Sequence, residues 1–131
     1  MAEPITDLAE LLRSMRPTLN PGVYAFVSLP HGTGAEPLQP IATFREPEGL
    51  SVIVDERAVA GRPVLFRSAW ITLAVHSDLA AVGLTAAVAA ALASAGISCN
   101  VVAAAFHDHL FVPVAFAEAA MSVLTALAAR S

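Results

Sequence analysis

The spacing of apolar residues in the first half of the chain predicts one helix followed by several strands. Residues 5–17 place apolar side chains at helical intervals, with Thr6 or Asp7 as the N-cap and Pro17 as the stop. Residues 22–30, GVYAFVSLP, are typical of a strand. Residues 39–46 and 50–56 predict two more strands that form a hairpin around Pro-Glu-Gly, and residues 55–61 predict a short helical turn.

The second half predicts a long strand and two longer helices. Residues 63–77 are a strand candidate that bends near Ser68, and residues 81–96 form a helix of alanine-rich sequence that ends at Gly96. Residues 97–106 predict a strand, His107 and Asp108 a tight turn, and residues 109–113 the returning strand. An amphipathic helix over residues 114–130 completes the pattern.

The order of these elements indicates an internal repeat. GLSVIVDERAVA aligns with HLFVPVAFAEAA sixty residues further on, with Leu50 over Leu110 and Val52 over Val112. Each half then corresponds to a βαββαβ unit that lacks one strand. We expect a strand near residues 63–76 to join the two units.

Composition narrows the class of protein. Hydrophobic residues make up 56% of the chain and charged residues 14%, against about a quarter charged in typical domains, so we expect a homodimer. The net charge is −4 and all seven basic residues are arginines. Without a basic stripe, nucleic acid is not an expected partner. The single cysteine, Cys99, favours the cytoplasm.

We expect neither a secretory signal nor a membrane span. The first residues carry acids and lack an apolar signal core. Residues 79–106 carry no charge, which would be long enough for a span, but the segment is mostly alanine and SAGISCN interrupts it.

The run His107-Asp108-His109 admits several interpretations. Two histidines on one strand face, with His76 nearby, could bind zinc, and a His–Asp pair could act as a general base. Neither is favoured, because no further ligand spacing and no nucleophile motif accompanies them. The simplest interpretation is a hairpin turn held by Asp108, and contact with a ligand or a partner unit stays open.

The segment SDLAAVGLTAAV, followed by AGISCN and HDHLFVP, resembles the ACT domain, in the branch of small uncharacterised bacterial proteins with two ACT-like units. The resemblance covers about a third of the chain. It implies an α+β fold of tandem ferredoxin-like units, with antiparallel sheets and helices on one face. We place these units at residues 1–66 and 67–131. Members of that branch carry Gly-Tyr-Tyr or Gly-Phe-Tyr before the histidines, where this chain has Ala104-Ala105-Phe106.

The resemblance further implies a small-molecule effector, most plausibly an amino acid, bound where the helix after Asp78 begins. A helix N-terminus suits a ligand carboxylate, Gly83 would let the ligand approach, and Asn100 would contact it from the facing strand. We therefore expect Gly83→Val to block binding at little cost in stability. The expected ligand contacts are Ser77, Asp78, Val82, Gly83, Leu84, Asn100 and His107.

The sequence thus predicts a regulatory or sensor protein that is not an enzyme and holds no metal or cofactor. Two alternatives stay open. One is a structural or protein-interaction module without a ligand. The other, less favoured, is a small enzyme that uses His76, His107 and Asp108.

Overall fold

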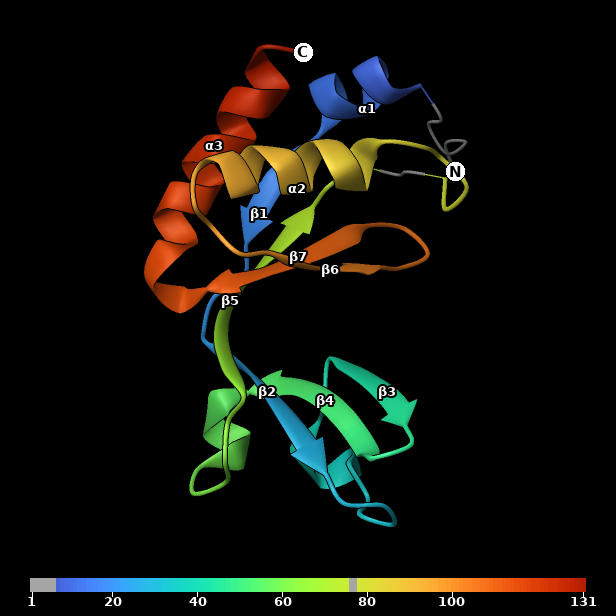
Figure 1. Cartoon of the computed structure of the whole chain (residues 1–131), viewed down its shortest axis with the longest axis vertical. Coiled ribbons are helices and arrows are strands. Elements are labelled where there is room, and N and C mark those ends of the chain that lie inside the picture. Colours follow the sequence, from blue (N-terminus) through green and yellow to red (C-terminus); the bar gives the residue numbers. More distant parts are fainter. Residues whose placement is uncertain (1–6, 76–77) are drawn as a thin grey trace.

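The computed structural model describes residues 7–75 and 78–131, and within them seven strands form one antiparallel sheet (Figure 1). The strand order is β3-β4-β2-β5-β7-β6, and β1 also pairs with β5. The strands are β1 (Pro17–Leu19), β2 (Tyr24–Leu29), β3 (Ala42–Glu46), β4 (Gly49–Asp55), β5 (Phe66–Leu73), β6 (Asn100–Ala103) and β7 (Asp108–Pro113). The α-helices are α1 (Leu8–Ser14), α2 (Leu84–Ser94) and α3 (Ala117–Ala129), and the 3-10 turns are η1 (Glu36–Leu38), η2 (Glu56–Val59) and η3 (Val114–Phe116).

The α+β prediction and the two ferredoxin-like units are confirmed. The second unit, which is the upper unit in Figure 1, has the strand order β1-β5-β7-β6, with α1, α2 and α3 together on one face. The first unit, which is the lower unit in Figure 1, contains β2, β3 and β4, with η1 and η2 beside them. Its helical elements are short turns, so the two units are unequal in size.

The first helix and strand of the chain pack with the second unit. Strand β1 lies antiparallel to β5, with Pro17 opposite Leu73, and α1 contacts α2 and α3. Residues 8–19 thus supply the fourth strand and a third helix to the unit that begins near residue 67. Strand β1 is absent from the sequence-based prediction, because its three residues carry no pattern of their own.

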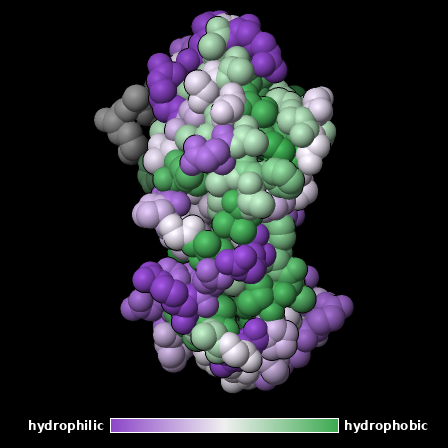
Figure 2. All heavy atoms as spheres, turned by 90° about the vertical axis from the view of Figure 1, so that its left-hand side faces the viewer, coloured by the Kyte–Doolittle hydropathy of each residue, from purple (hydrophilic) through white to green (hydrophobic). Residues whose placement is uncertain are grey.

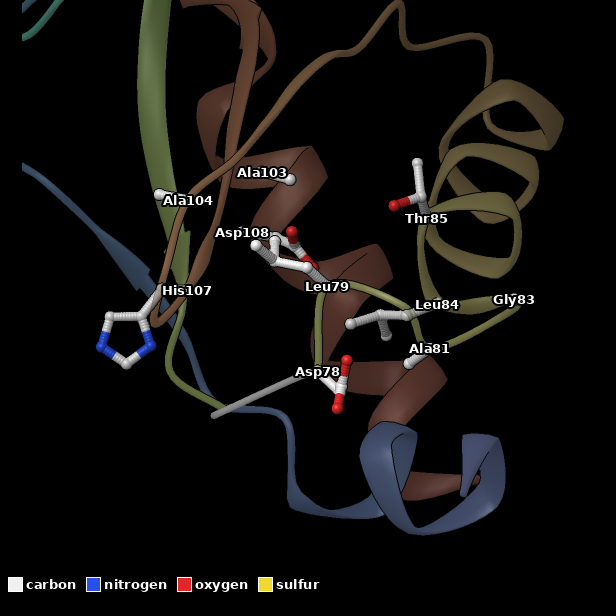
Figure 3. Close-up of a pocket in the computed structure, with 10 residues that line it drawn as sticks. All are labelled: Asp78, Leu79, Ala81, Gly83, Leu84, Thr85, Ala103, Ala104, His107 and Asp108. Carbon is white, nitrogen blue, oxygen red and sulfur yellow. The ribbon is translucent and has the colours of Figure 1, made fainter. Parts of the chain in front are cut away.

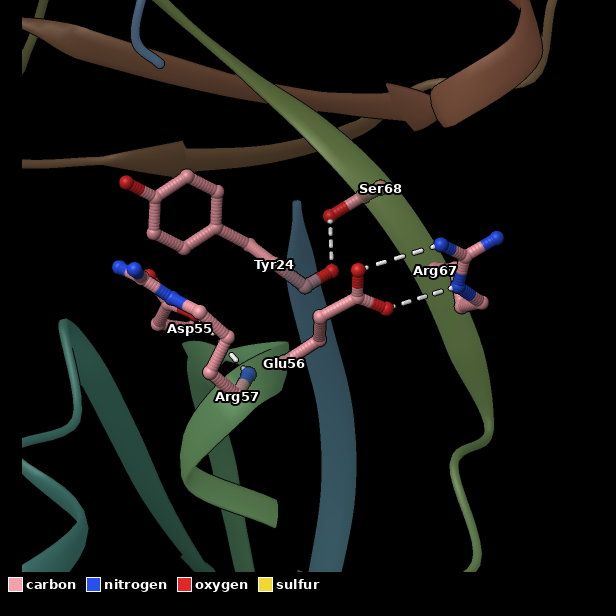
Figure 4. Close-up of polar contacts among 6 residues, drawn as sticks. All are labelled: Tyr24, Asp55, Glu56, Arg57, Arg67 and Ser68. Carbon is pink, nitrogen blue, oxygen red and sulfur yellow. Dashed lines mark hydrogen bonds and ion pairs between the residues drawn. The ribbon is translucent and has the colours of Figure 1, made fainter. Parts of the chain in front are cut away.

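Strand β5 joins the two units, as predicted. Its first residues pair with β2, its last residues pair with β1, and β7 lies along its other edge. The buried Ser68 stands where β5 passes from one unit to the other, and its hydroxyl donates to the Tyr24 carbonyl at 2.8 Å (Figure 4). Beside this joint, Arg67 forms an ion pair with Glu56 at 2.9 Å.

Each unit has its own hydrophobic core. In the upper unit, side chains from the three helices pack on alternate residues of β5 and β7, including Ile71, Leu73, Leu110 and Val112. In the lower unit a smaller cluster surrounds Val27 and Val52. On the face shown in Figure 2, apolar side chains gather at the middle of the molecule, between more polar ends. In the described ranges, no helix is both long and apolar enough to cross a bilayer.

Candidate functional site

A cavity of about 100 Å³ lies where the loop after β5 enters α2, facing the ends of β6 and β7 (Figure 3). Loop and strand ends meet here because β5, β6 and β7 are adjacent and α2 packs across them. The lining residues are Asp78, Leu79, Ala81, Gly83, Leu84, Thr85, Ala103, Ala104, His107 and Asp108. The loop, the start of the helix and the hairpin singled out in the sequence therefore meet at one place.

The loop from Asp78 to Gly83 is shaped by a side-chain hydrogen bond and by the backbone conformation of Gly83. The Asp78 carboxylate accepts a hydrogen bond from the Ala80 amide at 2.7 Å, and this holds a turn before the helix. Gly83 is the N-cap of α2 with φ of +106°, and no side chain caps the helix. No described side chain accepts from the first amide groups of α2, which carry the partial positive charge of a helix N-terminus.

Gly83 has a second role that the sequence does not reveal. A Cβ placed on Gly83 would lie 3.0 Å from Cδ2 of Leu8 on α1, so the absent side chain makes room for α1. The expectation that Gly83→Val costs little stability is therefore wrong. The residue has left-handed backbone geometry that L-residues rarely adopt, and a branched side chain would collide with Leu8.

Asp108 is the site residue whose position differs most from the prediction. It does not form the turn, but begins β7 opposite Leu73 and Ala103. The turn comprises residues 104–107 and is closed by a hydrogen bond from the Ala104 amide to the His107 carbonyl at 3.0 Å. Asp108 is 8% exposed and its carboxylate points toward the cavity (Figure 3). No described residue donates a hydrogen bond to that carboxylate, and burial raises its pKa.

His107 and His109, on either side of Asp108, have different surroundings. His107 lines the cavity, but its ring points away from the carboxylates of Asp78 and Asp108 (Figure 3). His109 is paired with Thr72 and contacts Trp70, on the sheet face opposite the helices. Within residues 7–75 and 78–131, no three His, Cys, Asp or Glu side chains are grouped so that they could hold a metal ion. His76 lies outside these ranges.

The other predicted contacts are only partly brought together. Leu84 lines the cavity and is buried, whereas Val82 is 83% exposed beside it. Asn100 pairs with Phe111, so its side chain lies on the sheet face away from α2 and does not line the cavity. Ser77 lies outside the described residues. Thr85 and Asp108 line the cavity and were missing from the predicted set. Thr85 stands two positions after Gly83, so its place at the start of α2 could have added it to the predicted contacts.

Comparison with known proteins assigns the family. Two family models described as ACT domain match residues 3–62 and 65–126. A crystal structure of a protein of unknown function from Vibrio cholerae, described as a possible transport protein, is 44% identical. The match covers 92% of this chain and 95% of that one, with a TM-score of 0.84. The chain therefore belongs to the ACT-domain family, as a small protein with two such domains in tandem.

More distant structures share the fold. A protein from Agrobacterium tumefaciens is 18% identical over 87% of this chain and 89% of that one, with a TM-score of 0.65. The ligand-free regulatory subunit of aspartate kinase from Thermus thermophilus is 14% identical over 85% and 95% of the two chains, with a TM-score of 0.61. No curated protein shows significant similarity to the chain. ACT domains are regulatory rather than catalytic modules.

Proposed function

We propose that this protein is a regulatory sensor that binds a small molecule, an amino acid, at the N-terminus of α2. The observation that carries the proposal is Asp108, a residue only 8% exposed whose carboxylate faces the cavity and receives no hydrogen bond from any described residue. Partial loss of hydration disfavours the charged form of this carboxylate, as the direction of its pKa indicates. A ligand that brings its own donor would offset that loss of hydration.

The two ends of the cavity suit the two ends of an amino acid. The uncapped start of α2 offers amide groups and positive potential to a carboxylate, while Asp108 offers a charge-assisted bond to an ammonium group. The cavity volume of about 100 Å³ favours a small amino acid. The fold shared with a regulatory subunit of aspartate kinase supports a regulatory role.

We further propose that the protein is not an enzyme. The His107 ring points away from Asp108, so the two side chains do not form a general-base pair. Burial raises the pKa of the Cys99 thiol to about 11, which leaves it protonated and a poor nucleophile at neutral pH. These features support a binding protein, and the single cysteine supports a reducing compartment, the cytoplasm.

The test is calorimetric titration of the whole protein with glycine and alanine, and with acetate and propionate as analogues without the amino group. We expect the amino acids to bind and the analogues to bind much more weakly. Asp108→Asn keeps the shape and removes the charge. We expect it to weaken amino-acid binding about tenfold or more, as for a lost hydrogen bond to a charged group, with little effect on the analogues.

Two comparisons separate loss of binding from loss of folding. The raised pKa of Asp108 means that the folded state disfavours the charged carboxylate. The free energy of unfolding of the parent protein therefore falls as pH rises through that pKa. Asp108→Asn should therefore melt at least as high as the parent at neutral pH. Asn100→Ala, on the other sheet face, should bind as the parent does. If Asp108→Asn bound amino acids normally, or if no amino acid bound the parent at millimolar concentration, the proposal would fail.

A further inference from the structure

The face of the sheet opposite the helices carries an aromatic surface, packed around the buried ring of Phe111, that the proposed function does not use. Phe26 on β2 contacts Phe66 and Phe111 edge-on, each with ring centroids 5.5 Å apart. Trp70 on β5 contacts Tyr24 at 5.1 Å and stacks on Phe111 at 6.3 Å. These five rings belong to both units, so the surface crosses the joint at β5.

The sheet curls so that its two edge strands, β3 and β6, border a groove over this surface. The β6–β7 hairpin lies above β3 and β4 in Figure 1. The groove has a part of about 240 Å³ against β2, β3 and β4 and a part of about 120 Å³ against β5 and β7. Ala42 on β3 and Val102 on β6 line both parts and so mark the junction between them. Phe44 and Leu65 line the larger part, and they are 74% and 73% exposed.

One polar group in the groove has a defined hydrogen-bonding role. The indole Nε1 of Trp70 donates to Nδ1 of His109 at 3.0 Å, and an indole N–H can only donate. Nδ1 of His109 is therefore the unprotonated nitrogen, and Nε2 carries the hydrogen. Thr72 Oγ1 lies 3.2 Å from the same Nδ1 and accepts from Asn20 at 3.0 Å, which is consistent with that tautomer.

His109 presents this N–H to the groove as an uncharged donor. Burial lowers the pKa of His109, so the ring is neutral at physiological pH. His109 lines the smaller part of the groove, and no described residue accepts a hydrogen bond from Nε2. Besides His109, the described lining side chains with polar groups are Thr43 and Ser51 in the larger part and Trp70, whose indole N–H is bonded to His109.

We propose that this groove is a second binding site, for an uncharged and largely apolar small molecule whose single hydrogen-bond acceptor bonds to Nε2 of His109. None of the described lining residues is charged, and the Glu46 carboxylate beside the groove is already bonded to the Ser51 hydroxyl, so a charged ligand would lose its hydration without gaining an ion pair from the lining. The aromatic floor favours a flat ring system, which can stack on it. The site lies on the sheet face opposite the α2 cavity, and the two share one lining residue, Ala104 in the β6–β7 turn.

The test uses 6-acetyl-2-dimethylaminonaphthalene, a neutral fluorescent ketone, and 2-dimethylaminonaphthalene, which lacks the carbonyl acceptor. Trp70 is the single tryptophan of the chain, so energy transfer from it reports binding of the probe to the protein, and the substitutions below assign that binding to the groove. We expect saturable transfer with both probes and about 3- to 10-fold tighter binding of the ketone, as for one hydrogen bond. Nitrogen NMR of the His109 ring should show the Nε2–H tautomer.

Two substitutions locate the site. His109→Phe removes the donor and keeps the bulk, so the preference for the ketone should vanish while the plain naphthalene still binds. Val102→Glu places a longer charged side chain at the junction and should abolish binding of both probes, whereas Val102→Thr should bind as the parent does. Circular dichroism checks that each variant is folded.

The contrary outcomes are equally specific. The proposal is overturned if the parent shows no saturable transfer, if Val102→Glu binds both probes normally, or if the ketone preference survives in His109→Phe. It is also overturned if Val102→Glu converts an oligomer into a monomer while the parent binds no probe, since a second copy of the chain would then cover the groove. Amino-acid titration of the same variants reports separately on the α2 site.

Discussion

Gly83 has two properties at once that a residue with a side chain could not have. Its φ of +106° turns the chain into α2, and its missing Cβ admits Leu8 of α1. Gly61 has a similar φ of +85°, but a Cβ there would meet no atom within 4 Å. The two glycines therefore form a matched pair that separates backbone strain from packing.

We predict that Gly83→Ala destabilises the protein more than Gly61→Ala does. Both substitutions incur the cost of a left-handed backbone, about 1–2 kcal/mol, and Gly83→Ala adds the close contact with Leu8. Urea denaturation followed by circular dichroism measures both. Equal losses would show that α1 moves aside freely and that Gly83 serves only the turn.

At the residue scale, the sequence predicts local chemistry better than long-range placement. Asp7 caps α1 by accepting from the Glu10 amide at 3.0 Å, as its position before an amphipathic segment indicates. Asp108 next to His107 has the composition of a turn, yet the turn consists of Ala104, Ala105, Phe106 and His107. The register of β7 against β5 decides this, and no local pattern encodes that register.

At the scale of the elements, β5 pairs with more strands than any other strand in the described part of the chain. It pairs with β1, β2 and β7, and it changes partner from β2 to β1 along one edge while staying paired to β7 on the other. Ser68 is fully buried at this change and bonds to the Tyr24 carbonyl. A hydroxyl at a buried strand position is costly unless it is bonded, so this bond holds the two units together at the joint.

We predict that Ser68→Ala lowers the free energy of unfolding by about 1 kcal/mol, the net value of a typical buried hydrogen bond. Ser51→Ala removes the hydroxyl that bonds to Glu46 on the exposed side of β4, and should cost much less. Thermal and urea unfolding of both variants provide the measurement. A loss at Ser68 no larger than at Ser51 would mean that β5 crosses the joint without help from this bond.

The elements with a strong periodic pattern were predictable, and the short ones were not. Residues 81–96 and 114–130 predicted α2 and α3, and the hairpin of β3 and β4 follows its Pro-Glu-Gly turn. Strand β1 and the turn η1 have three residues each, which is too short for any period. Strand β1 forms because β5 offers an unpaired edge beside α1, which is a tertiary cause.

At the scale of the whole molecule, the internal repeat and the ACT resemblance were enough to predict two ferredoxin-like units. They did not predict that residues 8–19 complete the second unit, or that the sheet curls until β3 and β6 border one groove. Both features depend on how β5 bends at Ser68. The sequence predicted the candidate site at the loop and at the start of α2. It did not predict that Asp108 faces the cavity, because that position depends on the register of β7.

The surface around the α2 cavity exposes large apolar side chains, which indicate how the protein assembles. Leu79 is 70% exposed, Val82 83% and Phe106 53%, and all three belong to the loop or the hairpin that borders the cavity. Residues 68–131 carry only four charged side chains, Asp78, Asp108, Glu118 and Arg130. An exposed apolar surface with so few charges is typical of a face that another subunit covers. We infer that two copies pair across this surface.

We predict that the protein is a homodimer and that Val82→Asp shifts it toward the monomer, because a buried unpaired carboxylate at the interface would be left without hydration. Phe44 is 74% exposed and belongs to the first unit, so Phe44→Asp is the control and should remain dimeric. Sedimentation equilibrium at tens of micromolar measures all three proteins. A monomeric parent would contradict the assembly itself. A dimer that resists Val82→Asp but is lost in Phe44→Asp would place the interface on the first unit, and the cavity at α2 would then be open in the assembled protein.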